Sequence, residues 1–454
     1  MTLDPAFEPT ITVGVLTSPA VDFEGEFDVA GSEETVCGPA RAVVSGASIV
    51  VECGGRRAVY ASGLLLTPSR RGTTSFVIRG VVIGISFHWE RKEDQRFTGA
   101  LRLVAKGRDV VAINVVPVEE YLASVISSEM SAAGSMNLLK AHAITSRSWL
   151  LAQRERSGVL KAGGKRYPAT VRAHDRLVRW YDREEHDLYD VCADDHCQRY
   201  QGITKSFTDA VRQAVDQTRG QVVMHDGSIC DARFSKSCGG ITEPFEKVWQ
   251  PVRVPYLVSV ADTPASDRLP DFLSLPDVSR EDLADRWIRC SPPAFCNTTD
   301  TRILSRVLLA YDQETTDFYR WKVEYAQEYI AALIREKSGI DFGAIIDLVP
   351  VGRGPSGRLT LLKIVGEKRT MTIGKELEIR RTLSPSHLES SAFVVDRHDI
   401  AGTVPGRFVL TGAGWGHGVG LCQIGAAVMA EQGYSPESIL SHYFPGTSIS
   451  VLYT

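Results

Sequence analysis

Residues 117–151 read PVEEYLASVISSEMSAAGSMNLLKAHAITSRSWLL. Leu122, Val125 and Ile126 recur at the spacing of one helix face. Gly134 interrupts that pattern, and a second run of apolar residues at helical spacing follows it. The stretch therefore predicts a helix hairpin.

Glu129 occupies the next position on the apolar stripe of the first helix. A carboxylate on a buried helix face is costly unless it is paired, protonated or directed into a cleft. Lys140 and Arg147 lie seven residues apart and present two cations on one face of the second helix. Spacing alone leaves two interpretations of Glu129: a structural carboxylate paired with Arg147 or Lys140, or a functional acid.

Four blocks of sequence, taken in order, resemble one known family. They are SSEM with LLKAHAITSRSW in the predicted hairpin, FSKSCGGITEPFEKVW at 234–249, GWGHGVGLCQIGA at 414–426 and HYFPGT at 442–447. Together they resemble the SpoIID/LytB family, which contains stage II sporulation protein D and amidase-enhancer relatives. In that family the acidic residue before the Met is the catalytic acid of a peptidoglycan lytic transglycosylase. The resemblance implies that Glu129 is this acid.

The implied reaction cleaves the MurNAc-GlcNAc bond of peptide-free glycan strands and leaves 1,6-anhydro-MurNAc ends. A single acid is sufficient, because the nucleophile is the C6 hydroxyl of the substrate and not a second carboxylate. Glu129 would protonate the glycosidic oxygen and then accept the hydroxyl proton. Arg147 would orient Glu129 or hold a substituent of the sugar, and Lys140 would be a further substrate contact.

Two other classes of function are compatible with the sequence. In the first, the chain is a non-catalytic glycan-binding module that stimulates a separate cell-wall amidase, as the amidase-enhancer relatives imply. In the second, it is a zinc hydrolase that uses the cluster at residues 186–197. A hydrolase would lose its rate on chelation with its fold intact, whereas removal of a structural zinc would disturb the fold.

Four potential zinc ligands fall within twelve residues: His186, Cys192, His196 and Cys197. Zn²⁺ accepts both sulfur and nitrogen donors, and four protein ligands would make the site structural. The spacing is not that of a zinc finger, so a cysteine-bearing loop without metal is an equal alternative on the residues alone. The family resemblance favours zinc, because some members carry it in an equivalent segment with a similar His-Cys-Gln-x-Tyr run.

Serine and glycine residues of the second block are candidate sugar contacts. Ser235 and Ser237 share a face of an extended segment, and Gly239 lets a backbone approach a ligand closely. Glu243 is a further polar candidate at this site. Where the family commonly has Asn, this chain has Cys238, which removes one amide from the substrate contacts. The alternative is a Ser/Gly hairpin loop with no ligand.

The third block contains four glycines at alternate positions, 414 to 420. It lacks the Lys and Ser/Thr of a phosphate-binding loop, so nucleotide binding is not expected. We expect a tight loop before a helix that places His417 and Gln423 in the cleft beside Glu129. A histidine held by hydrogen bonds to its own loop is an equally weighted alternative for His417.

Composition excludes several classes of protein. The 454 residues have a formal net charge of −4, and no basic stripe indicates nucleic-acid binding. No apolar run reaches the length of a membrane span. No basic region followed by an apolar segment begins the chain, so no secretory signal is visible, although peptidoglycan as a partner implies the cell envelope or periplasm.

Nine cysteines are scattered along the chain, and their odd number argues against a complete disulfide framework. Cys290 and Cys296 flank a short loop and could form a disulfide, or could remain two free thiols.

The predicted fold class is α+β. We expect a β-rich N-terminal region at 1–105, then a SpoIID/LytB-like catalytic domain at 106–454 in which the helix hairpin and mixed strands form a substrate cleft. The segment at about 265–400 is longer than the compact family pattern needs, and we interpret it as an elaboration of the same fold.

Overall fold

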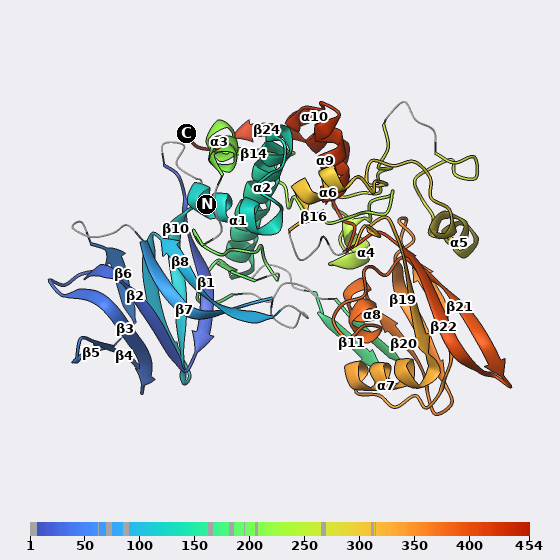
Figure 1. Cartoon of the computed structure of the whole chain (residues 1–454), viewed down its shortest axis with the longest axis horizontal. Helices are drawn as coiled ribbons and strands as arrows, with labels where there is room; N and C mark the ends of the chain where they lie inside the picture. The colour runs from blue at the N-terminus through green and yellow to red at the C-terminus, as the bar shows by residue number, and fades with distance from the viewer. Residues whose placement is uncertain are drawn as a thin grey trace. The chain divides into compact units, whose positions relative to one another are not determined.

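The computed structural model describes residues 7–61, 63–69, 75–84, 90–161, 167–180, 186–194, 196–204, 208–264, 269–309, 313 and 315–454. The chain forms two compact units (Figure 1). Unit 1 consists of Met1–Ala162, Arg183–Val222 and Ser450–Thr454, and unit 2 of Gly163–Asp182 and Val223–Ile449. The fold is mixed α+β, as the sequence predicts.

Unit 1 is built on an eleven-stranded sheet, which includes the blue and cyan arrows of Figure 1. The order is β13-β1-β10-β9-β6-β2-β3-β4-β5, and β7 pairs with both β2 and β8. Burial alternates along the strands: in β1, Ile11, Val13 and Val15 are buried and the residues between them are partly exposed. The strands are β1 Thr10–Ser18, β2 Ala20–Val29, β3 Thr35–Ser45, β4 Ser48–Cys53, β5 Arg56–Tyr60, β6 Leu64–Pro68, β7 Ser75–Ile83, β8 Arg91–Thr98, β9 Ala100–Lys106, β10 Asp109–Pro117 and β13 Val191–Cys192.

The predicted helix hairpin is present and belongs to unit 1. Strand β10 leads directly into the first helix, with Pro117 just before it, where a missing backbone N–H costs nothing. Glu119 and Glu120 lie in its first turn, at the positive end of the helix dipole. The described helices of unit 1 are α1 Val118–Glu129, α2 Met136–Lys161 and α3 Asp209–Gln217.

A buried ion pair joins the two helices of the hairpin. The Arg147 guanidinium, 0% exposed, donates from Nε to Glu119 Oε1 at 3.0 Å and from Nη2 to Glu119 Oε2. Its Nη1 donates to the carbonyl of Gln221 at 2.9 Å. Glu119 Oε1 also accepts from the backbone of Gly220 at 3.2 Å and from the Tyr453 hydroxyl at 2.6 Å. This pair therefore fixes α1, α2, the turn at residue 220 and the C-terminal segment together.

The expectation for Arg147 is thereby corrected. Its partner is Glu119 and not Glu129, and its complete burial leaves no donor on the surface for a sugar. The sequence missed this pairing because Glu119 has two roles at once: it lies in the first helical turn, where acids are common anyway, and it also faces α2.

Unit 2 contains several smaller sheets. The largest has five strands in the order β11-β12-β20-β19-β18, a second has the order β17-β22-β21, and β16 pairs in parallel with β23. Strands β14, β15 and β24 form a further three-stranded sheet. The bounds are β11 Thr170–Ala173, β12 Arg176–Arg179, β14 Gln221–His225, β15 Ser228–Ile229, β16 Phe234–Ser235, β17 Arg320–Ala326, β18 Ile345–Arg353, β19 Leu359–Gly366, β20 Thr370–Gly374, β21 Phe393–Ala401, β22 Val404–Ala413, β23 Leu421–Cys422 and β24 Ser448–Val451.

Helices α7 and α8 pack against the sheets of unit 2. The core there includes Ile330 and Ile334 of α7, Ile379 of α8, Ile364 of β19 and Phe408 of β22, all fully buried. The helices of this unit are α4 Phe245–Val248, α5 Glu281–Arg289, α6 Thr301–Val307, α7 Gln327–Ser338, α8 Glu376–Thr382, α9 Gln423–Glu431 and α10 Pro436–Tyr443.

The division of the chain differs from the expected domains. The boundary expected near residue 105 falls inside β9, in the middle of one continuous sheet, so the β-rich region and the hairpin share unit 1. The segment at about 265–400 supplies most of the core of unit 2 and is its body, not a decoration. None of the described helices is long and apolar enough to cross a lipid bilayer.

The Glu119–Arg147 pair predicts a large stability effect. Replacing Arg147 by Ala leaves a buried carboxylate without its cation, so the free energy of unfolding should fall by about 3–5 kcal/mol. The matched control is Lys140→Ala on the same helix, where the side chain is partly exposed and a change within about 0.5 kcal/mol is expected. Urea unfolding followed by circular dichroism measures both. Equal effects of the two substitutions would contradict the assignment.

Candidate functional site

Glu129 is the last residue of α1 and is partly exposed. Its Oε1 accepts a hydrogen bond of 2.8 Å from the backbone N–H of Arg199. Arg199 lies in the segment that carries the four predicted zinc ligands, which we call the Cys/His loop (residues 186–194 and 196–201). A backbone donor orients the carboxyl group without a mobile side chain, so the geometry of Glu129 depends on the position of this loop.

The Cys/His loop is attached to the sheet of unit 1. Strand β13, within the loop, pairs in parallel with β1. The Asp190 carboxylate accepts from both the backbone N–H and the hydroxyl of Thr12, at 2.9 and 2.8 Å. The ring of Tyr189 lies against Gly14, where an added Cβ would come within 2.4 Å of the ring. A side chain at residue 14 would therefore displace the loop.

The same loop is attached to α1. The rings of Tyr200 and Tyr121 stack with centroids 5.1 Å apart, and the Tyr121 hydroxyl donates to Gln198 Oε1 at 3.3 Å. The backbone N–H of Gln201 donates to Ser124 Oγ at 3.1 Å. These contacts lie on both sides of Arg199, so the amide that holds Glu129 is fixed to the helix that carries Glu129.

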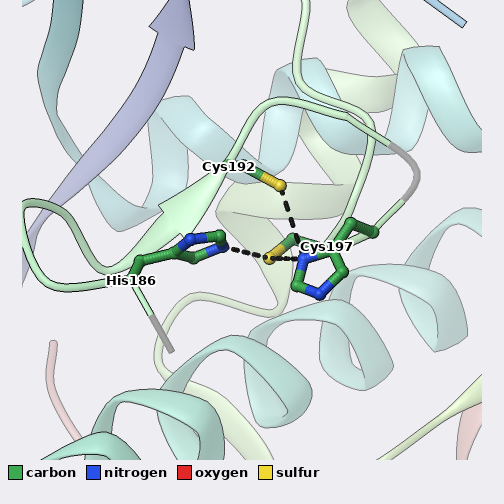
Figure 2. Close-up of side chains that lie close together, drawn as sticks. His186, Cys192 and Cys197 are labelled. Carbon is green, nitrogen blue, oxygen red and sulfur yellow. Dashed lines mark hydrogen bonds between the residues drawn. The ribbon is translucent and has the colours of Figure 1, made fainter. Parts of the chain in front are cut away.

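The four predicted zinc ligands lie together (Figure 2 labels His186, Cys192 and Cys197). The Cys197 sulfur lies 3.4 Å from His186 Nε2 and 3.5 Å from His196 Nδ1. The Cys192 sulfur lies 3.7 Å from the same nitrogen of His196. With Zn–S near 2.3 Å and Zn–N near 2.05 Å, a tetrahedral ion would set each N···S edge at about 3.6 Å. The donor types and their separations therefore fit a four-ligand zinc site.

In unit 2, the second and third sequence blocks lie side by side. Strands β16 and β23 pair in parallel, which places Ser235 opposite Cys422. Ser237 and Trp415 exchange two backbone hydrogen bonds, of 3.0 and 2.8 Å. We call these two segments the FSKSCGG segment (residues 234–240) and the glycine loop (residues 414–420). Their pairing was not predicted, because nearly two hundred residues separate them in sequence.

Burial changes the interpretation of the FSKSCGG segment. Ser237 is 0% exposed and Ser235 is 6% exposed, so neither hydroxyl is presented to a polysaccharide at the surface. Gly239 has φ of +80°, and a Cβ there would lie 2.8 Å from the backbone nitrogen of Gly414. The close approach that requires this glycine is therefore to the glycine loop and not to a ligand. Sequence alternation showed which serines share a face, but not that this face is covered.

Glu243 is also an interior residue. Its Oε2 accepts from both the backbone N–H and the hydroxyl of Ser356. Burial raises the pKa of Glu243 to about 7, against the opposing effects of the Ser356 hydrogen bonds and the positive charge of Arg358. A fully buried carboxyl group that is hydrogen-bonded to Ser356 inside its own unit is not placed to contact sugar.

A buried arginine that the sequence analysis missed holds the two segments. Arg358, 1% exposed, donates to the carbonyls of Cys238 and Gly416, both at 3.0 Å, and of Ser237 at 3.3 Å. It also donates to Ser356 Oγ at 3.0 Å. Because Arg358 follows the turn-like GRGPSG run, nothing in the local sequence distinguishes it from an exposed loop residue.

His417 is hydrogen-bonded to its own loop, as the structural alternative for this residue predicts. Its Nδ1 accepts from the backbone N–H of Val419 at 3.0 Å, and its ring packs edge-on against Trp249 with centroids 5.2 Å apart. Burial, reinforced by nearby arginines, lowers the pKa of His417 well below its usual value, so the ring is neutral. Gln423, at the start of α9, is 6% exposed. A role in substrate contact stays a prediction for both residues.

Of the two alternatives for Cys290 and Cys296, a disulfide or two free thiols, the structure has the two free thiols. All nine cysteines are free thiols, and the Cys290 sulfur donates to the carbonyl of Trp287. The sulfur of Cys296 instead lies 3.7 Å from the sulfur of Cys238. Proximity in sequence was therefore a poor guide to the partner of Cys296.

Comparison with known proteins identifies the family. Residues 106–225, which contain Glu129, the hairpin and the Cys/His loop, match the family model described as stage II sporulation protein. The chain therefore contains a SpoIID domain. A second model, described as a domain of unknown function, matches residues 243–420 and so covers most of the body of unit 2.

The related sequences agree with this family. The chain is 24% identical to stage II sporulation protein D of Bacillus amyloliquefaciens over 340 residues, 75% of this chain and 76% of that protein. It is 26% identical to an uncharacterized protein of Brachyspira hyodysenteriae over 354 residues, 78% and 72% of the two chains. It is 27% identical to the amidase enhancer of Bacillus subtilis over 252 residues, 54% of this chain but 33% of that protein.

The raised pKa of Glu243 predicts a pH-dependent stability. The folded state binds a proton at this carboxyl group up to about pH 7, and the unfolded chain only up to about pH 4.5. The contribution of this group to the free energy of unfolding is therefore fully present below pH 4.5 and is lost as the pH rises through 7. The loss should be at most about 3 kcal/mol. Glu243→Gln should flatten this loss in urea unfolding at pH 5, 6, 7 and 8. Identical pH slopes for the two proteins would show that Glu243 is ionised throughout.

Proposed function

We propose that this chain is a peptidoglycan lytic transglycosylase in which Glu129 is the single acid and base. The SpoIID match and the names of the related proteins support a cell-wall-related function. The observation that carries the proposal is the hydrogen bond from the Arg199 backbone to Glu129 Oε1. It holds a partly exposed carboxyl group in one orientation at a helix end, within the family-matching segment.

The chemistry needs only this one group. Glu129, in its protonated form, transfers its proton to the oxygen of the MurNAc-GlcNAc bond as that bond breaks. The resulting carboxylate takes the proton of the C6 hydroxyl, whose oxygen forms the new bond to C1 of the same sugar. The products are a GlcNAc hydroxyl end and a 1,6-anhydro-MurNAc end, and Glu129 regains its proton. No water is consumed, so no second carboxylate is required to activate it.

We further propose that the Cys/His loop holds a structural zinc ion. His186, Cys192, His196 and Cys197 would provide four ligands and leave no open position for water. The ion would keep the loop in the shape that directs the Arg199 N–H at Glu129. Its effect on activity would therefore be indirect.

The first test replaces Glu129 by Gln. Removing the transferable proton should reduce cleavage of peptide-free glycan strands by at least about 10²–10⁴-fold, while strand binding is retained. Mass spectrometry of the products should show 1,6-anhydro ends from the wild type. The matched control is Glu120→Gln, also on α1, where the carboxylate lies 3.5 Å from Arg212 and activity should be unchanged.

Each other outcome selects another function. Full activity in Glu129→Gln would place the acid elsewhere. Products with free reducing ends would indicate a hydrolase. Saturable glycan binding without any product would favour the non-catalytic module that stimulates a cell-wall amidase, the function that the amidase-enhancer relative suggests.

The second test removes the metal from the Cys/His loop. Chelation, or the Cys192→Ser/Cys197→Ser double substitution, should increase hydrogen exchange of the Arg199 amide by about tenfold or more, because local unfolding exposes it. Amides in the middle of α2 should keep their protection, and Cys37→Ser, at an exposed cysteine, should change nothing. A zinc hydrolase would instead lose activity with the Arg199 amide still protected.

A further inference from the structure

A second group of metal-ligand side chains lies in the interior of unit 2. It consists of Cys238, Asp262, Cys296 and Cys422, and we call it the Cys₃Asp group. All four residues are at most 2% exposed, and their ligand atoms all lie within 4.8 Å of one another. They come from three separate parts of the chain: the FSKSCGG segment, the region around α5, and the strand that leads into α9.

The spacing of the sulfur atoms distinguishes a metal site from a disulfide. The sulfurs of Cys238 and Cys296 are 3.7 Å apart, whereas a disulfide requires about 2.05 Å. With Zn–S at about 2.3 Å, the S···S edge of a tetrahedral site is about 3.8 Å. The observed separation matches that edge.

The hydrogen bonds around the group are those that thiolate and carboxylate ligands receive. The Cys422 sulfur accepts from the backbone N–H of Cys238 at 3.3 Å, and the Cys238 sulfur accepts from the N–H of Gly240 at 3.4 Å. Such donors to ligand atoms orient the ligands and share their negative charge.

Asp262 brings a fully buried carboxyl group to the three sulfurs. Its Oδ1 accepts from the Tyr443 hydroxyl at 2.6 Å and its Oδ2 from the backbone N–H of Cys296 at 2.8 Å. Among the described residues, no lysine, arginine or histidine forms an ion pair with this fully buried carboxylate. A buried carboxyl group must either bind a proton or be paired with a cation, and a divalent cation beside three thiolates would provide that pairing.

We propose that the Cys₃Asp group binds a second zinc ion, independent of the Cys/His loop and of the proposed reaction. Sulfur-rich donors select zinc over magnesium or calcium. Binding releases the three thiol protons to solvent, and four protein ligands leave no site for substrate or water. The ion therefore fastens the FSKSCGG segment and the glycine loop to the region between Asp262 and Cys296.

The metal content of the full chain, purified without chelator, tests this proposal. Inductively coupled plasma mass spectrometry should find about two zinc ions per wild-type chain and about one after Cys422→Ser, because one ligand of a four-ligand site is lost. Cys192→Ser/Cys197→Ser should also leave about one. Cys290→Ser, a matched control six residues from Cys296, should leave the content unchanged.

Zinc-edge X-ray absorption identifies the remaining ligands. In Cys192→Ser/Cys197→Ser, the retained zinc should have about three sulfur neighbours and one oxygen, and a further Asp262→Cys should raise the sulfur count to about four. If the variants fail to fold, the absorption spectrum of the wild-type protein tests the proposal by itself. The average should be about 2.5 sulfur neighbours per zinc ion. One zinc per wild-type chain with about two sulfurs, or a Cys238–Cys296 disulfide in a non-reduced digest, would overturn the proposal.

Discussion

Two buried guanidinium groups, one in each unit, each hold together several segments of their own unit. A guanidinium keeps its charge at any ordinary pH and has five N–H donors, so a buried one must be surrounded by acceptors. In unit 1, Arg147 obtains them from Glu119 and the carbonyl of Gln221. In unit 2, Arg358 obtains them mainly from loop carbonyls. In unit 1, Arg147 and Glu119 both lie within the segment that matches the SpoIID family model.

The position of Glu129 follows from this constraint. Helix α1 is fixed at its first turn by the Glu119–Arg147 pair and along its length by the Cys/His loop, which stacks Tyr200 on Tyr121. The carboxyl group at the far end then receives the Arg199 N–H. A group that exchanges a proton with substrate must be positioned closely, and here the backbone and two packed elements provide that position. The side chain of Arg147 contributes only by supporting the helix.

The sequence predicted what depends on local pattern. The helix hairpin, the β-rich first region and the grouping of the four Cys and His side chains all follow from spacing or residue type within short segments. What it missed depends on contacts across long separations. The exposure of Ser237 could not be judged without knowing that Trp415 lies beside it. Arg358 resembles a loop residue, and its acceptors lie up to 121 residues away. For Cys296 the sequence offered only the nearby Cys290 as a possible disulfide partner, whereas Cys238 lies beside it in the structure.

Cys238 shows how one residue can be misjudged when it is considered alone. Relative to the family's common Asn, it reads as a lost sugar contact. In the structure its side chain faces the interior, beside Cys296 and Cys422, where no sugar could reach it. In the proposed second zinc site, the same residue would be a metal ligand. Both proposed metal sites are closed four-ligand sets, so neither has a coordination position at which water could become a nucleophile. The proposed reaction needs no such position, because its nucleophile is the substrate's own hydroxyl and Glu129 would transfer the protons.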